Sequence, residues 1–104
     1  MNNQSAVDNL VEKIVAAVHP LKIILFGSAA RGDFLEDSDL DFLVVMPAGV
    51  HRRRVAQDLY RRINGAGRPF DILVATPEDL EKHGDNAGLI YERILREGRE
   101  IYAA

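Results

Sequence analysis

Two aspartates separated by one residue are the side chains of this sequence whose type and spacing could do chemistry. Asp39 and Asp41 flank Leu40 at the start of an apolar run that continues to Val45. Successive side chains of a strand point to opposite faces, so the two carboxylates share a face. Carboxylates in an apolar setting repel each other unless they are paired or bind a metal, and such oxygen ligands suit Mg²⁺. The pair therefore indicates a metal site.

A third carboxylate, Asp71, lies at the start of another expected strand, residues 70–75. If this strand is a neighbour of the one that carries Asp39 and Asp41, all three carboxylates converge at one end of a sheet. Water and substrate phosphates then complete the coordination of Mg²⁺. The alternative is that each aspartate caps a turn at a strand end, which accounts for any one of them alone but not for the set.

Gly27 and Ser28 follow an expected strand at residues 21–26 and open a helical turn. Glycine lets the backbone approach a ligand closely, and free N–H groups at a helix start favour an anion. Arg31 lies one turn further on. It either binds a phosphate through two hydrogen bonds or is a solvated turn residue. These groups would donate hydrogen bonds to phosphates and would face a metal that the carboxylates bind. This is the arrangement that nucleotidyl transfer assisted by two metal ions requires.

A sheet with covering helices has to position these residues, and the apolar pattern predicts both. Residues 6–18 repeat apolar side chains with a helical period, with Ser5 as the expected N-cap. The order of elements predicts an α/β (α+β) fold in which helices flank a small mixed sheet. The expected helices are residues 6–18, 50–63, a short one that Thr76 caps at Pro77, and one from 86 or 87 to about 97; the expected strands are residues 21–26, 40–46, 70–75 and 100–102.

Length and composition restrict the class of protein. The chain has 104 residues, which predicts one domain over 1–104. It has no cysteine, which excludes disulfides and thiolate metal sites, and we expect a cytoplasmic protein without a secretory signal. No apolar run approaches the roughly 20 residues that span a bilayer. The net charge is −3, so nucleic acid is not an expected partner.

Five arginines of the expected second helix have two interpretations. The one we favour is a solvated helix face. The alternative is a docking surface for an acidic partner or for RNA, which would allow a nucleic-acid-modifying enzyme, although the overall acidity weighs against it. The arginines are Arg52, Arg53, Arg54, Arg61 and Arg62.

The run from Gly27 to Phe42, G-S-A-A-R-G-D-F-L-E-D-S-D-L-D-F, resembles a family signature. The DNA polymerase beta-like nucleotidyltransferase superfamily carries G-S, ten residues and then D-x-D, and this spacing is present here. The fuller run is similar to the minimal nucleotidyltransferase branch of that superfamily, including the antitoxins encoded with HEPN-domain toxins. The resemblance implies the polymerase beta-like nucleotidyltransferase core.

The resemblance also implies roles for individual residues. Asp39 and Asp41 would hold two Mg²⁺ ions, and Asp71 would complete the site and help to deprotonate the acceptor hydroxyl. Gly27 and Ser28 would hold the β- and γ-phosphates. A hydroxyl would attack the α-phosphate of ATP and release pyrophosphate.

The partner that the resemblance implies is a HEPN-type toxin, in a hetero-oligomer with this chain. Some members of the branch are antitoxins that transfer AMP from ATP to a tyrosine of such a toxin. The chain has no appended domain for a bulky acceptor, so we expect the acceptor to be a separate protein. The alternative function is a non-enzymatic antitoxin, a binding module that neutralises its partner by stoichiometric association.

Overall fold

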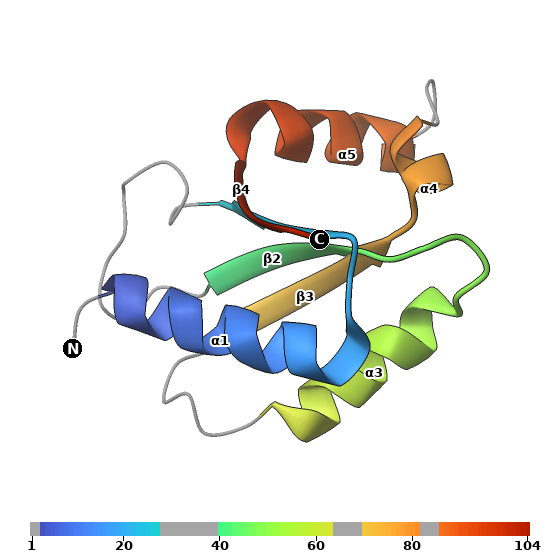
Figure 1. Cartoon of the computed structure of the whole chain (residues 1–104). Helices are drawn as coiled ribbons and strands as arrows, with labels where there is room; N and C mark the ends of the chain where they lie inside the picture. Colours follow the sequence, from blue (N-terminus) through green and yellow to red (C-terminus); the bar gives the residue numbers. More distant parts are fainter. Residues whose placement is uncertain (1–2, 28–39, 64–69, 82–85) are drawn as a thin grey trace.

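The computed structural model describes residues 3–27, 40–63, 70–81 and 86–104, with side chains over residues 5–27, 40–63, 70–81 and 90–104. In these residues a four-stranded sheet is covered by helices on both faces (Figure 1). The strands are β1 (Lys22–Phe26), β2 (Leu40–Val45), β3 (Phe70–Ala75) and β4 (Arg99–Ala103).

The sheet has the order β3-β2-β1-β4. Strand β1 is antiparallel to both β2 and β4, whereas β2 and β3 run parallel to each other. This arrangement confirms the expected small mixed sheet. It also brings the end of β1 beside the starts of β2 and β3, which is the end of the sheet where the sequence predicts the site.

Helices α1 (Asn3–Val18) and α3 (Arg52–Arg62) cover one face of the sheet, and α4 (Pro77–Glu81) and α5 (Asn86–Glu97) cover the other (Figure 1). Alternate side chains of β2 pack against the helices on opposite faces of the sheet. Leu40, Phe42 and Val44 pack toward α1 and α3, whereas Leu43 and Val45 pack against α5. Within the described ranges, no helix has both the length and the apolar character to cross a membrane.

Two expected helix starts are wrong. Helix α1 begins at Asn3, so Ser5 lies inside the helix and is not its N-cap. The apolar period begins at Ala6, but the backbone helix extends further toward the N-terminus. Helix α3 begins at Arg52 rather than at residue 50, because His51 is its N-cap and accepts a hydrogen bond at Nδ1 from the Arg54 N–H at 3.2 Å.

The short helix α4 begins as the sequence predicts, with Thr76 as its cap. The Asp79 carboxylate accepts hydrogen bonds from the Thr76 N–H at 2.9 Å and from the Thr76 hydroxyl at 3.0 Å. The Asp79 N–H donates back to the hydroxyl of Thr76 at 3.4 Å. Because Arg52 Nη1 lies 3.2 Å from Asp79 Oδ1, this capping pair also joins the start of α3 to α4.

Candidate functional site

Asp41 and Asp71 lie opposite each other on neighbouring parallel strands. In the register of β2 and β3, each is the second residue of its strand, and adjacent strands are about 4.8 Å apart. Leu43 and Leu73, two residues further on, lie on the α4/α5 side of the sheet, so both carboxylates belong to that side. Asp41 is half-buried and Asp71 is exposed, so the pair can reach a ligand from solvent.

Gly27 packs against the first of these carboxylates. It follows Phe26, which lies opposite Asp41 in the antiparallel pairing of β1 with β2. Its φ of +78° belongs to the left-handed region, which glycine adopts without strain. A Cβ placed on Gly27 would collide with Asp41 Oδ2 and would lie 3.3 Å from its Cγ. The absence of a side chain at Gly27 therefore makes room for the Asp41 carboxylate.

The other three residues of the predicted site, Ser28, Arg31 and Asp39, lie outside the described residues. Their roles in phosphate and metal binding stay predictions. The described part of the chain contains no cluster of three or more His, Cys, Asp or Glu side chains that could hold a metal. It supplies the Asp41–Asp71 pair, which is two of the three predicted carboxylates.

The donor set of this pair fits Mg²⁺. Both groups are carboxylates, which are hard oxygen ligands, and Mg²⁺ is commonly bound by one or two of them together with water and substrate phosphates. The in-register pairing places both on one side of the sheet, where a cation would offset their mutual repulsion. The space beside Gly27 that a Cβ would need is filled by the Asp41 carboxylate.

A hollow of about 270 Å³ adjoins Gly27 between the end of β1 and α5. Phe26 and Ile94 form apolar parts of its wall, and Arg93 lines it while its Nε pairs with Glu97 Oε2 at 3.3 Å. These α5 residues were not among the predicted site residues. The spacing of Ile90, Arg93 and Glu97, which places them on one helix face, is the signal that could have identified them.

Comparison with known proteins assigns this arrangement to a family. The model of the nucleotidyltransferase domain matches residues 7–101. The chain belongs to this nucleotidyltransferase family. The match covers all four strands except the last residues of β4, and it confirms the resemblance that the Gly27-to-Phe42 run carries.

A protein of related sequence also supports the assignment of this chain to the nucleotidyltransferase family. A putative protein adenylyltransferase of Methanocaldococcus jannaschii is 45% identical over 104 residues, which cover 98% of this chain and 100% of the relative. This protein is therefore a nucleotidyltransferase whose relative is named for transfer of AMP to proteins.

Solved structures share the fold of the nucleotidyltransferase at lower identity. A putative nucleotidyltransferase of Sulfolobus solfataricus superposes with a TM-score of 0.65 at 22% identity, over 95% of this chain and 78% of that one. Spectinomycin adenyltransferase of Enterococcus faecialis, solved with ATP and spectinomycin, gives 0.61 at 18% identity, over 98% and 56%. A toxin–antitoxin structure with AMP-PNP gives 0.55 at 18% identity, over 99% and 75%. These likenesses confirm the fold.

Proposed function

We propose that this nucleotidyltransferase transfers AMP from ATP to a tyrosine hydroxyl of a partner protein, with Mg²⁺ as its metal. The observation that carries the proposal is the in-register pairing of Asp41 with Asp71 beside the Gly27 turn. Protein as the acceptor is supported by the name of the M. jannaschii relative. ATP as the donor is supported by two structural neighbours, one solved with ATP and one with AMP-PNP.

Each site residue has a proposed task. Asp39 and Asp41 would hold two Mg²⁺ ions, with Asp71 as a further ligand. Gly27 and Ser28 would hold the β- and γ-phosphates and Arg31 would bind a phosphate as well, while the lack of a side chain at Gly27 leaves room for the Asp41 carboxylate. When bound, Mg²⁺ supplies positive charge to the phosphates and to the departing pyrophosphate.

The proposed reaction is a single displacement at the α-phosphorus. The tyrosine oxygen forms a bond to the α-phosphorus, and the bond from that phosphorus to the oxygen bridging to the β-phosphate breaks. The Asp71 carboxylate takes the tyrosine proton, and pyrophosphate leaves with the bonding electrons. The exposure of Asp71 at the start of edge strand β3 is consistent with this task, because a macromolecular acceptor can reach it.

The partner that we propose is a HEPN-domain toxin, with this chain as its antitoxin in the cytoplasm. The signature run supports this choice, and a toxin–antitoxin structure is among the proteins that share the fold. The described residues form a small nucleotidyltransferase core, and we propose that the partner presents the acceptor tyrosine to it.

The test is incubation of the purified chain with labelled ATP, Mg²⁺ and the product of the neighbouring gene. We expect label on a tyrosine of that product, identified by mass spectrometry. Asp41→Asn with Asp71→Asn should abolish the transfer while circular dichroism shows a retained fold. Glu78→Gln is the matched control, because Glu78 is an exposed acid at the start of α4, away from the carboxylate pair.

Absence of transfer by the wild-type chain would contradict the proposal, as would undiminished transfer by the double variant. A cell-based assay separates catalysis from simple association. Protection of cells by the double variant would show that the chain neutralises its partner by stoichiometric binding. Loss of protection by the folded double variant would show that AMP transfer is required.

A further inference from the structure

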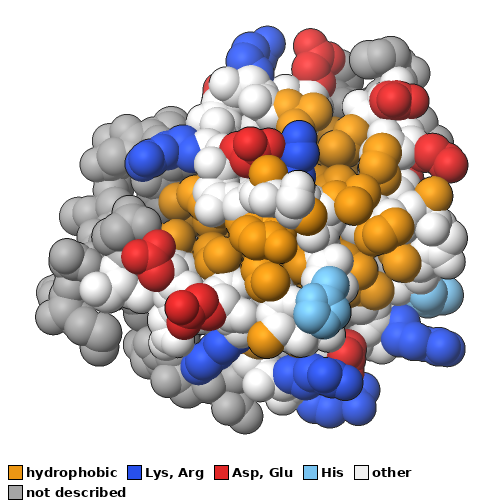
Figure 2. All heavy atoms as spheres, in the orientation of Figure 1, with side chains coloured by type: hydrophobic (Ala, Val, Ile, Leu, Met, Phe, Trp, Pro, Cys, Tyr) orange, Lys and Arg blue, Asp and Glu red, His pale blue; other side chains and the backbone are white. Residues whose placement is uncertain are grey.

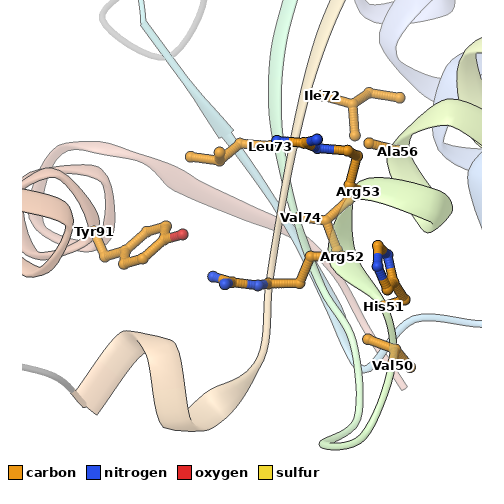
Figure 3. Close-up of a pocket in the computed structure, with 9 residues that line it drawn as sticks. All are labelled: Val50, His51, Arg52, Arg53, Ala56, Ile72, Leu73, Val74 and Tyr91. Carbon is orange, nitrogen blue, oxygen red and sulfur yellow. The ribbon is translucent and has the colours of Figure 1, made fainter.

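An open groove of about 670 Å³ runs along the outer edge of β3, between the start of α3 and α5 (Figure 3). Its volume falls within the range of about 300–1,000 Å³ that is usual for ligand-binding clefts. Ile72, Leu73 and Val74 line it from the strand, Arg52 and Arg53 line it from α3, and Tyr91 lines it from α5. None of the nine lining residues belongs to the predicted nucleotide site.

The groove is positively charged. Arg52 and Arg53 extend from the start of α3 across β3, toward Tyr91 and Leu73 respectively (Figure 3). Arg52 pairs with Asp79, whereas in the described part of the chain Arg53 has no ion-pair partner. The lining residues include two arginines but no acid. An occupant with carboxylates would therefore complement this groove.

The Lys and Arg side chains are unevenly distributed on this acidic protein. The largest group lies at the lower edge of the face in Figure 2, over α3, with others at its top and left, while hydrophobic side chains occupy the centre. Helix α3 carries five arginines, although the chain as a whole has a net charge of −3. Of these, Arg62 is neutralised within the helix by Asp58 at 3.1 Å. Three consecutive arginines, Arg52, Arg53 and Arg54, therefore place positive charge at the start of α3.

The floor of the groove is the free edge of the sheet. Strand β3 is the last strand on its side, and the Met46 N–H donates to the Ala75 carbonyl, so Ala75 faces β2. Backbone groups alternate along a strand, so those of Ile72 and Val74 face outward. The Ile72 N–H donates to the Tyr60 hydroxyl at 2.7 Å, whereas no described group pairs with the outward N–H of Val74. An extended main chain is the occupant that such an edge accepts.

We propose that this groove docks an extended acidic segment of the protein that receives AMP. The assignment rests on the proposed function for the identity of the partner. Carboxylates of the segment would pair with Arg53 and Arg52, and its main chain would lie beside the outward backbone of Val74, on the strand that carries Asp71. Val74 is three residues from Asp71, which is about 10 Å along a strand. The receiving hydroxyl would therefore lie within a few residues of the acidic stretch.

RNA is the other polyanion that such arginines attract, but the groove favours protein. Affinity for nucleic acid comes from many phosphate contacts, each of which steepens the dependence of binding on salt. This groove offers only two arginines, Arg53 and Arg52, for such contacts. A short acidic peptide needs only two or three such contacts, together with the strand edge.

The experiment measures fluorescence anisotropy of a labelled random Glu–Tyr copolymer, with a Lys–Tyr copolymer for comparison, in the absence of ATP and metal. We expect the Glu–Tyr copolymer to bind and the Lys–Tyr copolymer not to bind. Arg53→Glu should weaken binding at least about tenfold, because it places a like charge against the segment. Arg53→Gln should give a smaller loss.

Arg54→Glu is the matched control. Arg54 is the next residue of the same helix turn and makes the same change in charge, but it does not line the groove. Glutamate near a helix start is favourable at either position, so both variants should fold. Equal losses from Arg53→Glu and Arg54→Glu would overturn the proposal, as would absence of Glu–Tyr binding. If only polyuridylate bound, and if its binding depended on Arg53, the proposal would be overturned in favour of RNA as the occupant.

A transfer assay with labelled ATP and Mg²⁺ separates the two proposals. Arg53→Glu should raise the KM for the Glu–Tyr copolymer and leave kcat unchanged, since Arg53 does not contact the reacting groups. Arg53-dependent binding without any AMP transfer would contradict the proposed function and leave the docking groove standing. Equal KM values for Arg53→Glu and the wild-type chain would contradict the docking groove and leave the function standing.

Discussion

At Gly27, two independent requirements exclude a side chain. The backbone has φ of +78°, and the space that a Cβ would fill is occupied by the Asp41 carboxylate. Gly27→Ala should therefore lose both stability and AMP transfer. The backbone strain alone costs about 1–2 kcal/mol. Urea unfolding and the rate of AMP transfer measure the two effects.

Gly49→Ala is the control for Gly27→Ala. Gly49 also has a positive φ, +95°, but a Cβ there would have no neighbour within 4 Å. We expect Gly49→Ala to lose a similar amount of stability through backbone strain and to keep full AMP transfer. If Gly49→Ala reduced transfer as much as Gly27→Ala, then contact with Asp41 would not be the reason that position 27 needs glycine.

Asp71 is exposed, so its contribution to the site can be separated from stability. Asp71→Asn should leave the free energy of unfolding within about 0.5 kcal/mol of the wild-type value, as is usual for surface changes. It should lower the rate of AMP transfer by about 10²-fold or more, because a positioned base contributes that much. A stable variant with full transfer would assign proton removal to another group.

At the scale of single elements, the Thr76–Asp79 pair is the start signal of α4. Asp79→Ala removes the acceptor of the Thr76 N–H and hydroxyl, and should cost about 1–2 kcal/mol. Arg52→Ala removes only the ion pair, in which the arginine side chain is 51% exposed, and should cost less than about 1 kcal/mol. Urea denaturation measures both. Equal losses would show that the ion pair, not the cap, stabilises this junction.

Tyr60 covers part of the outer edge of β3. Its ring stacks on Phe70 with centroids 5.5 Å apart, and its hydroxyl accepts the Ile72 N–H. Tyr60→Phe keeps the ring and removes the acceptor, so it should cost about 1 kcal/mol and speed amide exchange at Ile72. Tyr102→Phe is the control, since the Tyr102 hydroxyl bonds to no described group. Unchanged exchange at Ile72 would contradict this role of the hydroxyl.

Elements bounded by strong local signals could be predicted from the sequence. The bounds of β3 agree with the expected 70–75, and α4 begins at Pro77 after its Thr76 cap. The α1 start could not be predicted from its apolar period, because that period reports packing on the sheet and not the extent of the backbone helix. The His51 cap of α3 was missed because histidine is an uncommon N-cap.

At the scale of the whole molecule, the strand order limits what a sequence can predict. The position of Asp71 near the start of its expected strand indicated that it would lie at the same end of the sheet as Asp41 if their strands were neighbours, and the structure shows that they are neighbours. The position of Arg52 and Arg53 beside β3 could not be predicted from such a pattern. Their position depends on how α3 crosses a strand that comes later in the chain, and no local pattern determines that crossing.

Ligand binding should stabilise the whole molecule. A ligand that binds only the native state raises its stability, so Mg²⁺ with ATP should raise Tm by several degrees and by more than either alone. Differential scanning fluorimetry measures this shift. Asp41→Asn should reduce the combined effect, and Gly49→Ala should preserve it. Equal shifts for Asp41→Asn and the wild-type chain would count against the assigned metal site.

The parallel pairing of β2 with β3 also has a consequence for the order of events in folding. It joins residues 41 and 71, which are thirty positions apart, so the chain must close a long loop before the pair forms. Such non-local pairings form slowly compared with helices. During synthesis, the Gly27 turn and Asp41 leave the ribosome well before Asp71. The enzyme therefore acquires the Asp41–Asp71 pair only when this long-range contact has formed, so activity cannot begin before β2 and β3 have paired.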